Sequence, residues 1–316
     1  MRDAARGEKV SIIGAGSVGS MLAQLILEHN LAHVMLIDID DGIARGKAYD
    51  LQDASHILGY GKIVEGTSDF SSMSGSDIVV ITAGFPRKPG MSREDLLRKN
   101  GAVISEVSLK IKEHAPDTVV IVVTNPLDAM SYLVYKTTGF VKRKVMGMAG
   151  VLDSARCSNQ AAIELGIPPA VVDSMVIGTH DTNMVPLFTS SRAQGMPFMK
   201  VFNEEKQCLI EQKTKKRGAE IVSFLKSGSA FFAPGAACFS MVKSIIKDEK
   251  FTLCASAYLE GEYGYNGFFI GVPVILGRSG IEKIIELEIA DQEKAKFKKA
   301  AEQAQSAVSE LKELFR

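Results

Sequence analysis

Two arginines lie close together in residues 83–97, AGFPRKPGMSREDLL, and their chemistry suggests a ligand. The planar guanidinium group of Arg87 or Arg93 can bind one carboxylate through two parallel hydrogen bonds. Two such groups on one loop suit a small anion that carries two carboxylates. The prolines and the glycine of this segment also favour turns, so a solvated basic loop is the alternative interpretation.

A glycine-rich sequence near the N-terminus points to a dinucleotide. Residues 14–19 read GAGSVG, after a β-branched run that predicts a strand and before a helical pattern. These glycines let the backbone approach a pyrophosphate, and the helix N-terminus supplies N–H donors. Asp38 follows the next predicted strand and can accept hydrogen bonds from ribose hydroxyls, which favours NAD over NADP. A glycine turn in another α/β protein is the alternative.

His180, in the sequence Gly-Thr-His, is a candidate acid–base group because imidazole titrates near neutral pH. A structural histidine is the alternative interpretation. Asp153 and Arg156 lie about one turn apart in a predicted helix, so both side chains leave from one face. A surface ion pair would have the same spacing.

The first half of the chain predicts the elements that position these residues. Short β-branched runs alternate with helical patterns, which predicts right-handed crossovers and a doubly wound parallel sheet. Strands are expected at residues 10–13, 34–37, 78–82, 119–123 and near 144–148. Helices are expected at residues 18–28, 44–57 and 92–114.

The second half is less regular and predicts an α+β domain. Helices are expected at residues 152–165 and 203–225, and from residue 291 an amphipathic pattern predicts a docking helix. Strands are expected at residues 171–177 and 268–277, the second with a break at residues 271–273. We therefore expect a nucleotide-binding domain at residues 1–148 and a substrate-binding, catalytic domain at residues 149–316.

The bulk composition excludes several classes of protein. The 316 residues include 37 Lys and Arg and 37 Asp and Glu, and this balance argues against nucleic-acid and membrane-surface binding. The four cysteines have no C-x-x-C spacing, so neither a disulfide framework nor a metal site is expected. Unpaired thiols fit the reducing cytoplasm. The uncharged stretch at residues 10–27 imitates a targeting segment, but its glycines and serines favour a strand, a turn and a helix.

Taken together, the motifs resemble the lactate/malate dehydrogenase family over nearly the whole chain. The matching segments are GAGSVG (14–19), Asp38, AGFPRKPGMSREDLL (83–97), TNPLD (124–128), GVLDSARC (150–157), GTH (178–180) and KTKKRGAEIV (213–222). Within the family, the chain is most similar to the NAD-dependent malate dehydrogenases that are lactate-dehydrogenase-like. The resemblance implies an N-terminal Rossmann domain, a C-terminal α+β domain, and reversible oxidation of (S)-malate to oxaloacetate by hydride transfer.

The resemblance also implies roles for individual residues. His180 would exchange the proton, and Asp153 would orient its imidazole and stabilise its charged form. Arg156 and Arg87 would clamp two carboxylates, while Arg93 would polarise the ketone when the loop closes. At the position of Arg87, lactate enzymes of the family typically carry a neutral residue such as glutamine.

The remaining implied residues surround the cofactor. Asn125 would lie near both the nicotinamide and the substrate. The implied NAD site comprises Gly14, Gly16, Ser17, Val18, Gly19, Asp38, Thr82, Ala83, Gly84, Asn100, Val123 and Asn125. The resemblance further implies a cytoplasmic homodimer or homotetramer that acts in the tricarboxylic acid cycle.

One departure from the family lies in the turn at residues 180–182, which would carry the catalytic histidine and is called the catalytic turn below. The family usually reads His-Gly-Asp-Thr-Met-Val-Pro, whereas this chain has Asp181 directly after His180. If the family glycine has a positive φ, aspartate tolerates it better than most residues. Alternatively, Asp181 would lie near the imidazole and raise its pKa further.

Three other functions stay open at this point. If Arg87 points outward, a lactate dehydrogenase or a broad 2-hydroxyacid dehydrogenase is favoured. An NAD-dependent glycoside hydrolase would need a Cys/His metal pair, for which no suitable cluster is evident. A non-catalytic NAD-binding protein is favoured only if the turn at residues 180–182 misplaces the histidine.

Overall fold

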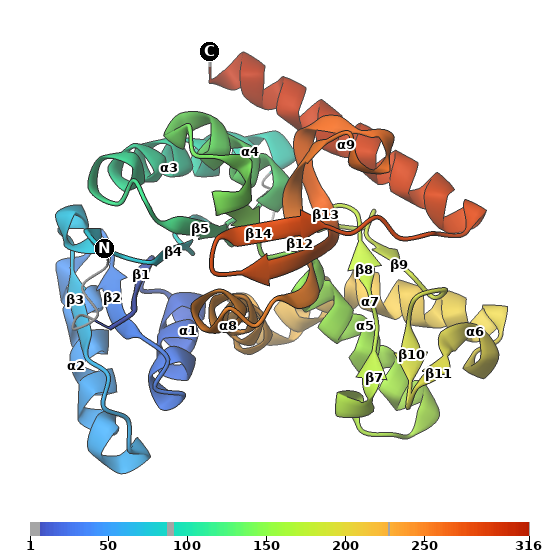
Figure 1. The fold of residues 1–316 in the computed structure, drawn as a ribbon, viewed down its shortest axis with the longest axis horizontal. Helices are drawn as coiled ribbons and strands as arrows, with labels where there is room; N and C mark the ends of the chain where they lie inside the picture. Colours follow the sequence, from blue (N-terminus) through green and yellow to red (C-terminus); the bar gives the residue numbers. More distant parts are fainter. Residues whose placement is uncertain (1–6, 87–91, 227, 316) are drawn as a thin grey trace.

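The computed structural model describes residues 7–86, 92–226 and 228–315 (Figure 1). Its centre is a nine-stranded sheet with the order β14-β13-β12-β6-β5-β4-β1-β2-β3. Six of these strands are parallel: β1 (Lys9–Ile13), β2 (His33–Ile37), β3 (Val64–Thr67), β4 (Ile78–Ile81), β5 (Val119–Val122) and β6 (Val145–Gly147). The order β6-β5-β4-β1-β2-β3 is that of a doubly wound Rossmann sheet, as predicted.

Helices cover both faces of the parallel part of this sheet. Their bounds are α1 (Ser17–Glu28), α2 (Asp41–Leu58), α3 (Arg93–His114) and α4 (Leu127–Thr138). Helices α3 and α4 lie on one face, and α1 lies on the other (Figure 1). The central strands β4, IVVI, and β5, VVIV, are buried along their whole length, which explains their pure β-branched sequences.

The second half of the chain extends the sheet with antiparallel strands. They are β12 (Phe251–Glu260), β13 (Asn266–Gly277) and β14 (Gly280–Ile284), and β12 joins β6 where Ser256 pairs with Gly147. Helix α8 (Phe232–Lys247) lies beside α1, where a Cβ on Gly235 would come within 2.7 Å of Met21 Cγ. The glycine therefore permits the close approach of these two helices.

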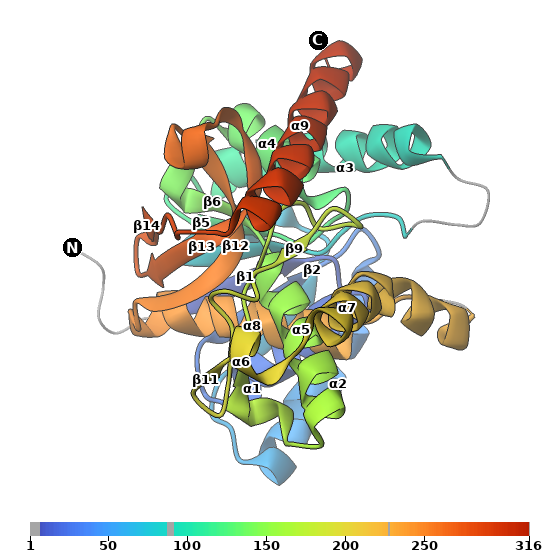
Figure 2. The same cartoon turned by 90° about the vertical axis from the view of Figure 1, so that its right-hand side faces the viewer.

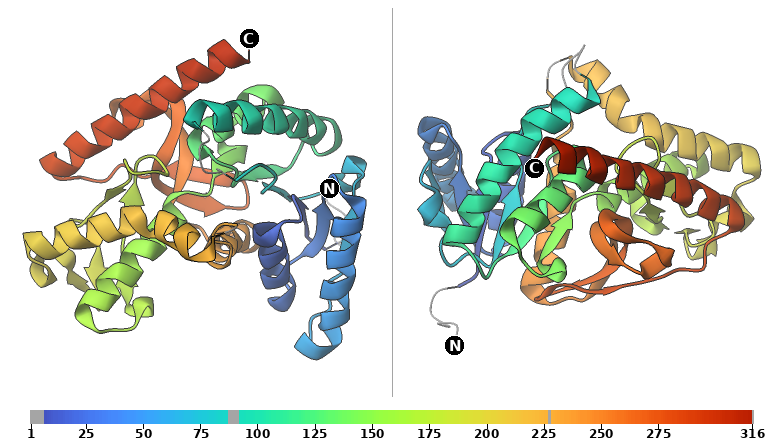
Figure 3. Two further views of the ribbon diagram at one scale, coloured as in Figure 1. Left: turned by 180° about the vertical axis from the view of Figure 1, so that it is seen from behind. Right: turned by 90° about the horizontal axis from the view of Figure 1, so that it is seen from above.

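The C-terminal helix α9 (Asp291–Leu314) lies along α4 and β13 (Figures 1 and 2). Its end reaches α3 (Figure 3). A Cβ on Gly101 of α3 would fall 2.3 Å from the ring of Phe315. The apolar stripe of α9 is buried, so the predicted docking helix is confirmed.

A smaller layer carries α5 (Gly150–Leu165) and α7 (Glu204–Leu225), which lie together at the side of the sheet (Figure 3). Short elements surround them: β7 (Val172–Asp173), β8 (Val176–Ile177), β9 (Val185–Pro186), β10 (Arg192–Ala193), β11 (Met196–Pro197) and α6 (Phe198–Val201). Single 3-10 turns occupy Phe70–Met73, Lys142–Lys144, Pro169–Val171 and Glu262–Gly264. Within the described residues, no helix is long and apolar enough to cross a membrane.

Two predicted strands need correction. The strand expected at residues 171–177 is divided into β7 and β8, which pair with different partners, β10 and β9. Between them the Ser174 hydroxyl donates to the Ser154 carbonyl at 2.8 Å, and Val176 N donates to the Ser154 hydroxyl at 3.0 Å. Polar groups of α5 thus hold this segment instead of a continuous ladder.

The break expected at residues 271–273 is also wrong, because β13 pairs with β12 throughout that stretch. Gly271 serves another purpose: it exchanges two backbone hydrogen bonds with Gly178, at 2.9 and 3.0 Å. A Cβ on Gly271 would come within 2.6 Å of the Gly178 oxygen. The glycine therefore lets the loop that follows β8 approach the sheet.

Candidate functional site

The carboxyl ends of β1, β2, β4 and β5 meet at one edge of the sheet, where the predicted NAD-binding residues lie. Gly14 follows β1 with φ of 104°, and a Cβ there would fall 2.6 Å from Ala83 N. A Cβ on Gly19, in the first turn of α1, would fall 2.1 Å from the Gly14 oxygen. Gly16, at the start of α1, has open space in front of it instead. Two glycines thus close the turn tightly, while the third leaves helix N–H groups accessible to a pyrophosphate, and NAD fits this edge.

Asp38 lies directly after β2, at the same edge of the sheet. Its carboxylate accepts hydrogen bonds from Ala15 N at 2.7 Å and from Asp40 N at 3.1 Å. The side chain is therefore fixed beside the glycine turn, and neighbouring Ile39 contributes no positive charge. This arrangement suits the two hydroxyls of a ribose better than a 2′-phosphate.

The predicted cofactor residues at the ends of β4 and β5 are tied to one another. The Thr82 hydroxyl donates to the Gly14 oxygen at 2.8 Å. The Asn100 amide, from α3, accepts from Phe85 N at 2.8 Å and donates to the Asn125 carbonyl at 2.6 Å. Ala83, Gly84 and Val123 lie in the same two strand ends. Asn125 is exposed there and precedes a cis peptide bond to Pro126.

The predicted acid–base pair is formed in the second half of the chain. Helix α5 begins at Gly150, where a Cβ would come within 2.3 Å of Cys254 Cβ, so its first turn lies against β12. This contact places Asp153, whose side chain is 2% exposed, beside His180. His180 Nδ1 lies 2.7 Å from Asp153 Oδ2. A proton on Nδ1 leaves Nε2 free to exchange a proton with a ligand.

The electrostatic surroundings of His180 favour its charged form. Burial alone would lower the pKa of this imidazole, but the charge and hydrogen bond of Asp153 outweigh it. Arg156 lowers the pKa and Asp128 raises it by smaller amounts, and the net pKa is above the ordinary value of 6.5. His180 is therefore suited to hold a proton between two steps of a reaction.

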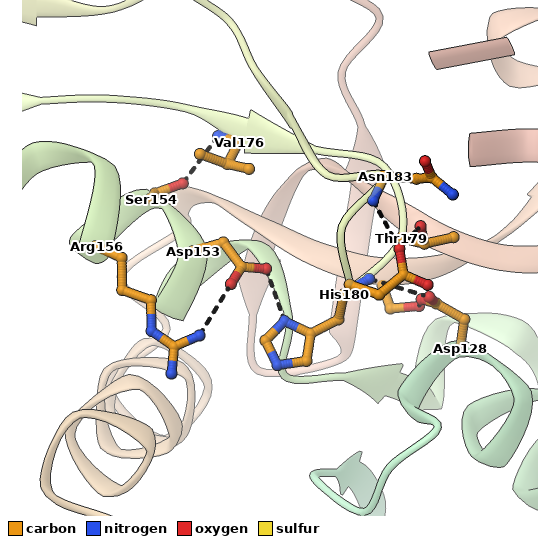
Figure 4. Close-up of polar contacts among 10 residues, drawn as sticks. Asp128, Asp153, Ser154, Arg156, Val176, Thr179, His180 and Asn183 are labelled. Atoms are coloured by element: carbon orange, nitrogen blue, oxygen red, sulfur yellow. Dashed lines mark hydrogen bonds and ion pairs between the residues drawn. The ribbon is translucent and has the colours of Figure 1, made fainter. Parts of the chain in front are cut away.

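Arg156 completes the cluster from the same helix. Its Nη1 lies 3.6 Å from Asp153 Oδ1, and its Nε, although buried, has no hydrogen-bond partner in the described part of the chain. Burial lowers the pKa of this guanidinium, Asp153 opposes that effect, and Arg217 adds to it. Figure 4 shows Asp153 between Arg156 and His180, whose side chains extend toward the same side. A guanidinium that is only 13% exposed, next to a proton carrier, suits the carboxylate of an acid substrate.

The arginine segment is described only in part. Arg87 lies outside the described residues, and of Arg93 the structure gives the backbone, as the first residue of α3. Ser92 caps this helix: Asp95 N donates to the Ser92 hydroxyl at 3.0 Å, and Ser92 N donates to the Asp95 carboxylate at 3.1 Å. The capping box explains why α3 begins at that point.

A model of the NAD binding domain of lactate/malate dehydrogenases matches residues 8–147, and a model of their alpha/beta C-terminal domain matches residues 150–314. The chain belongs to the lactate/malate dehydrogenase family. Malate dehydrogenase 1 of Anaeromyxobacter dehalogenans is 44% identical to it, over 98% of this chain and 99% of that one. Malate dehydrogenase of Bacillus subtilis is 45% identical, over 96% and 98% of the two chains.

Solved structures of the lactate/malate dehydrogenase family have the same fold but different substrates. Malate dehydrogenase of Cryptosporidium parvum is 39% identical with a TM-score of 0.94, covering 97% of this chain and 99% of its own. Lactate dehydrogenase of the same organism, described as a complex with lactic acid and nicotinamide adenine dinucleotide, is 35% identical with a TM-score of 0.94, covering 97% and 98%. The fold alone therefore does not separate the two substrates.

The departure from the family sequence has a structural explanation at Asp181. This residue has a negative φ, and the positive φ of the turn falls at Gly178, with φ of 91°, so no tolerance of a positive φ is required of Asp181. Its carboxylate accepts from the Thr179 hydroxyl and from Asn183 N, both at 2.8 Å, and from the Gln303 amide of α9. Asp181 therefore stabilises the turn internally.

The second carboxylate that raises the pKa of His180 is Asp128, a residue for which the sequence alone suggested no role. It accepts from His180 N at 3.4 Å and from the Ser256 hydroxyl at 2.6 Å (Figure 4). The only sequence signal was its place in the TNPLD segment, beside Asn125. Gln303 had no sequence signal, because it is a polar position on an amphipathic helix.

Replacing Gln303 with leucine is expected to destabilise the turn at residues 178–183. The Gln303 amide donates to Asp181 and accepts from the Asn183 side chain, so leucine would remove one hydrogen bond from the Asp181 carboxylate and one from the Asn183 amide. We expect a loss of about 1–3 kcal/mol in the free energy of unfolding, measured by urea denaturation. Gln305→Leu, at an exposed position of the same helix, is the control and should change it by less than about 0.5 kcal/mol. Equal effects of both substitutions would contradict this account of the turn.

Proposed function

We propose that this chain catalyses the reversible, NAD-dependent oxidation of (S)-malate to oxaloacetate. The observation that carries the reaction class is the cluster of His180, Asp153 and Arg156, which places a proton carrier beside a guanidinium group that can bind a carboxylate. The high identity to curated malate dehydrogenases supports the substrate. When bound, NAD supplies the hydride acceptor.

The cluster accounts for the proton and for one carboxylate. In the oxidation, His180 takes the hydroxyl proton on Nε2 while Asp153 stabilises the resulting imidazolium; in the reduction, the same proton returns to the ketone oxygen. Arg156 binds the carboxylate next to the reacting carbon through its planar guanidinium group. Because these side chains are only 2–13% exposed, their charge interactions are stronger than they would be in water.

The other proposed substrate residues come from the N-terminal half. Arg87 would bind the second carboxylate, since its position distinguishes the malate enzymes of the family. Arg93, at the start of α3, would stabilise the charge that develops on the oxygen of the reacting carbon, and its arrival on loop closure would exclude water. Asn125 would contact substrate and nicotinamide.

The proposed NAD site lies at the edge formed by the glycine turn and the ends of β4 and β5. Ser17 and Val18 would offer backbone N–H groups from the first turn of α1, and Asp38 would accept from the ribose. The residues that we assign to it are Gly14, Gly16, Ser17, Val18, Gly19, Asp38, Thr82, Ala83, Gly84, Asn100, Val123 and Asn125.

The decisive assay follows NADH oxidation by absorbance with oxaloacetate and with pyruvate at matched concentrations. A strong preference for oxaloacetate, together with NAD reduction by malate and not by lactate, would support the proposal. Comparable or better turnover of pyruvate would favour a lactate-type or broad 2-hydroxyacid dehydrogenase instead. NADH binding without turnover of either acid would indicate a non-catalytic protein. The hydrogen bond between His180 and Asp153 favours a catalyst over that alternative.

We also propose that the chain forms a homodimer or homotetramer in the cytoplasm and acts in the tricarboxylic acid cycle. Large apolar side chains stay exposed in the single chain, among them Tyr49 at 60% and Ile57 at 84% on α2, and Phe224 at 77% on α7. Free buried thiols fit a reducing compartment. Light scattering after gel filtration tests the assembly, and a monomeric mass would contradict it.

The domain boundary between residues 148 and 149 is likewise a proposal. The two family models divide the chain between residues 147 and 150, which supports it. The sheet nevertheless continues across the boundary, because β12 of the second half pairs with β6 of the first. We therefore expect the two halves to unfold in a single cooperative transition.

A further inference from the structure

Asp128 occupies a junction of three elements beside the catalytic turn. It is the second residue of α4, close behind the cis bond between Asn125 and Pro126. One carboxylate oxygen accepts the Ser256 hydroxyl of β12 at 2.6 Å, and the other accepts His180 N at 3.4 Å. The carboxylate therefore links α4 and the sheet to the main chain of the residue that carries the imidazole (Figure 4).

We propose that Asp128 is a positioning residue for His180, holding its main chain and adding negative charge behind its ring. The inference rests on the proposed function, in which His180 exchanges the proton. Asp153 fixes the Nδ1 side of the imidazole, while Asp128 accepts a hydrogen bond from the main-chain N–H of the same residue. A displacement of about 1 Å at a reacting group can lower a rate by about 10²-fold.

The charge on Asp128 is unfavourable for folding, which argues against a purely structural role. Burial raises the pKa of this carboxyl from its ordinary value of 3.8 to about 6, while Ser256 and His180 lower it and Asp181 raises it. The folded state thus binds the proton more tightly than the unfolded chain does, and stability falls as the pH rises from about 4 through about 6. An asparagine would bridge the same two elements without that loss.

The charged groups around this junction come from two other elements. From the catalytic turn, His180 and Asp181 face Asp128, and from α5, Asp153 and Arg156 face the imidazole. Asp128 raises the pKa of His180, so removing its charge should lower that pKa. Asp181 and the two α5 groups are unchanged in such a variant, which makes the shift attributable to Asp128.

The test is Asp128→Asn, which is nearly isosteric. We expect kcat for malate oxidation to fall by about 10- to 100-fold, as is typical when a residue that orients a reacting group is removed. We expect the acid limb of the kcat profile to move to lower pH. NMR titration of the His180 imidazole, assigned by its absence in His180→Asn, should move in the same direction.

Thermal unfolding tests separately whether the charge on Asp128 costs stability, while the His180 titration tests its action on the imidazole. The melting temperature of Asp128→Asn, relative to wild type, should increase as the pH rises from about 4 through about 6, because the variant has no carboxyl group whose pKa is raised by folding. Ser256→Ala removes one attachment of Asp128 without changing charge, and should reduce kcat with a smaller shift of the pH profile. Asp53→Asn, at an exposed position of α2, is the matched control and should change none of these quantities.

Two results would overturn the inference. One is Asp128→Asn with wild-type kcat and an unchanged His180 titration. The other is a variant that loses activity and melting temperature in parallel at every pH, again with an unchanged titration, because that describes a structural residue. If the wild type reduces no 2-oxo acid, the proposed function fails, and the His180 titration in the two proteins still decides whether Asp128 acts on the imidazole.

Discussion

Replacing His180 with asparagine is expected to lower kcat for malate oxidation and oxaloacetate reduction by about 10²- to 10⁴-fold, the usual contribution of a general acid–base group. Asparagine can still donate a hydrogen bond to Asp153 but cannot carry the proton. NADH affinity should stay within about twofold, because the glycine turn and Asp38 follow strands of the other half of the chain. Steady-state kinetics and fluorescence titration with NADH measure the two quantities.

The control for His180→Asn is His114→Asn, at the end of α3. His114 carries no proposed role and should retain wild-type kcat. A His180 variant that keeps more than about a tenth of wild-type kcat would contradict the assignment of this residue, whatever its effect on substrate binding. Loss of NADH binding in the same variant would show instead that the substitution disturbs the whole domain.

The pKa of His180 sets the expected pH dependence. Malate oxidation needs the neutral imidazole, and the pKa is raised above 6.5, so kcat for oxidation should still be rising at pH values where an ordinary histidine is already neutral. Oxaloacetate reduction needs the charged form and should decline over the same interval. Asp153→Asn removes the main group that raises the pKa, so the oxidation profile should shift to lower pH as kcat falls. A profile that does not move would mean that another group carries the proton.

The Rossmann half could be predicted from the sequence because its signals are local. Strands such as VVIV at β5 are buried on both faces and therefore have no polar positions. The glycine turn can be recognised from the spacing of its three glycines. The strands β3 and β12 were not predicted, since VEGT and FTLCASAYLE carry glycine, serine and polar residues amid the apolar ones. Those strands are stabilised by neighbours that are distant in the sequence, which a local pattern does not contain.

The candidate site shows the same division between local and distant information. The pair Asp153 and Arg156 could be expected from helical spacing, and His180 from its chemistry. Their contact depends on glycines that allow close approaches, such as that of Gly150 to β12 and that of Gly271 to Gly178. The sequence alone does not show which segments these glycines bring together. Asp128 was not predicted because its partners lie far away in the chain, on β12 and on the turn after β8.

Replacing Arg87 with glutamine is expected to change the substrate preference more than any other single substitution. If Arg87 binds the second carboxylate of oxaloacetate, pyruvate leaves its guanidinium desolvated without a partner, at a cost of about 3–5 kcal/mol. The wild type should then prefer oxaloacetate by about 10²- to 10³-fold or more in kcat/KM. Glutamine has no charge to desolvate, so kcat/KM for oxaloacetate should fall and kcat/KM for pyruvate should rise. The preference for oxaloacetate should then be lost or inverted.

The matched control for Arg87→Gln is Arg98→Gln. The Arg98 side chain is 66% exposed on α3 and pairs with Glu94 at 3.3 Å, so it offers the same change of charge close to the same segment without facing a ligand. The kcat/KM ratio for oxaloacetate over pyruvate should be unchanged there, which separates a direct contact from a general loss of positive potential. An equal fall of that ratio in both variants would mean that Arg87 attracts dicarboxylates at a distance. An unchanged ratio in Arg87→Gln would assign the second carboxylate to a different residue, and the lactate-type interpretation would then rest on whether the wild type prefers pyruvate.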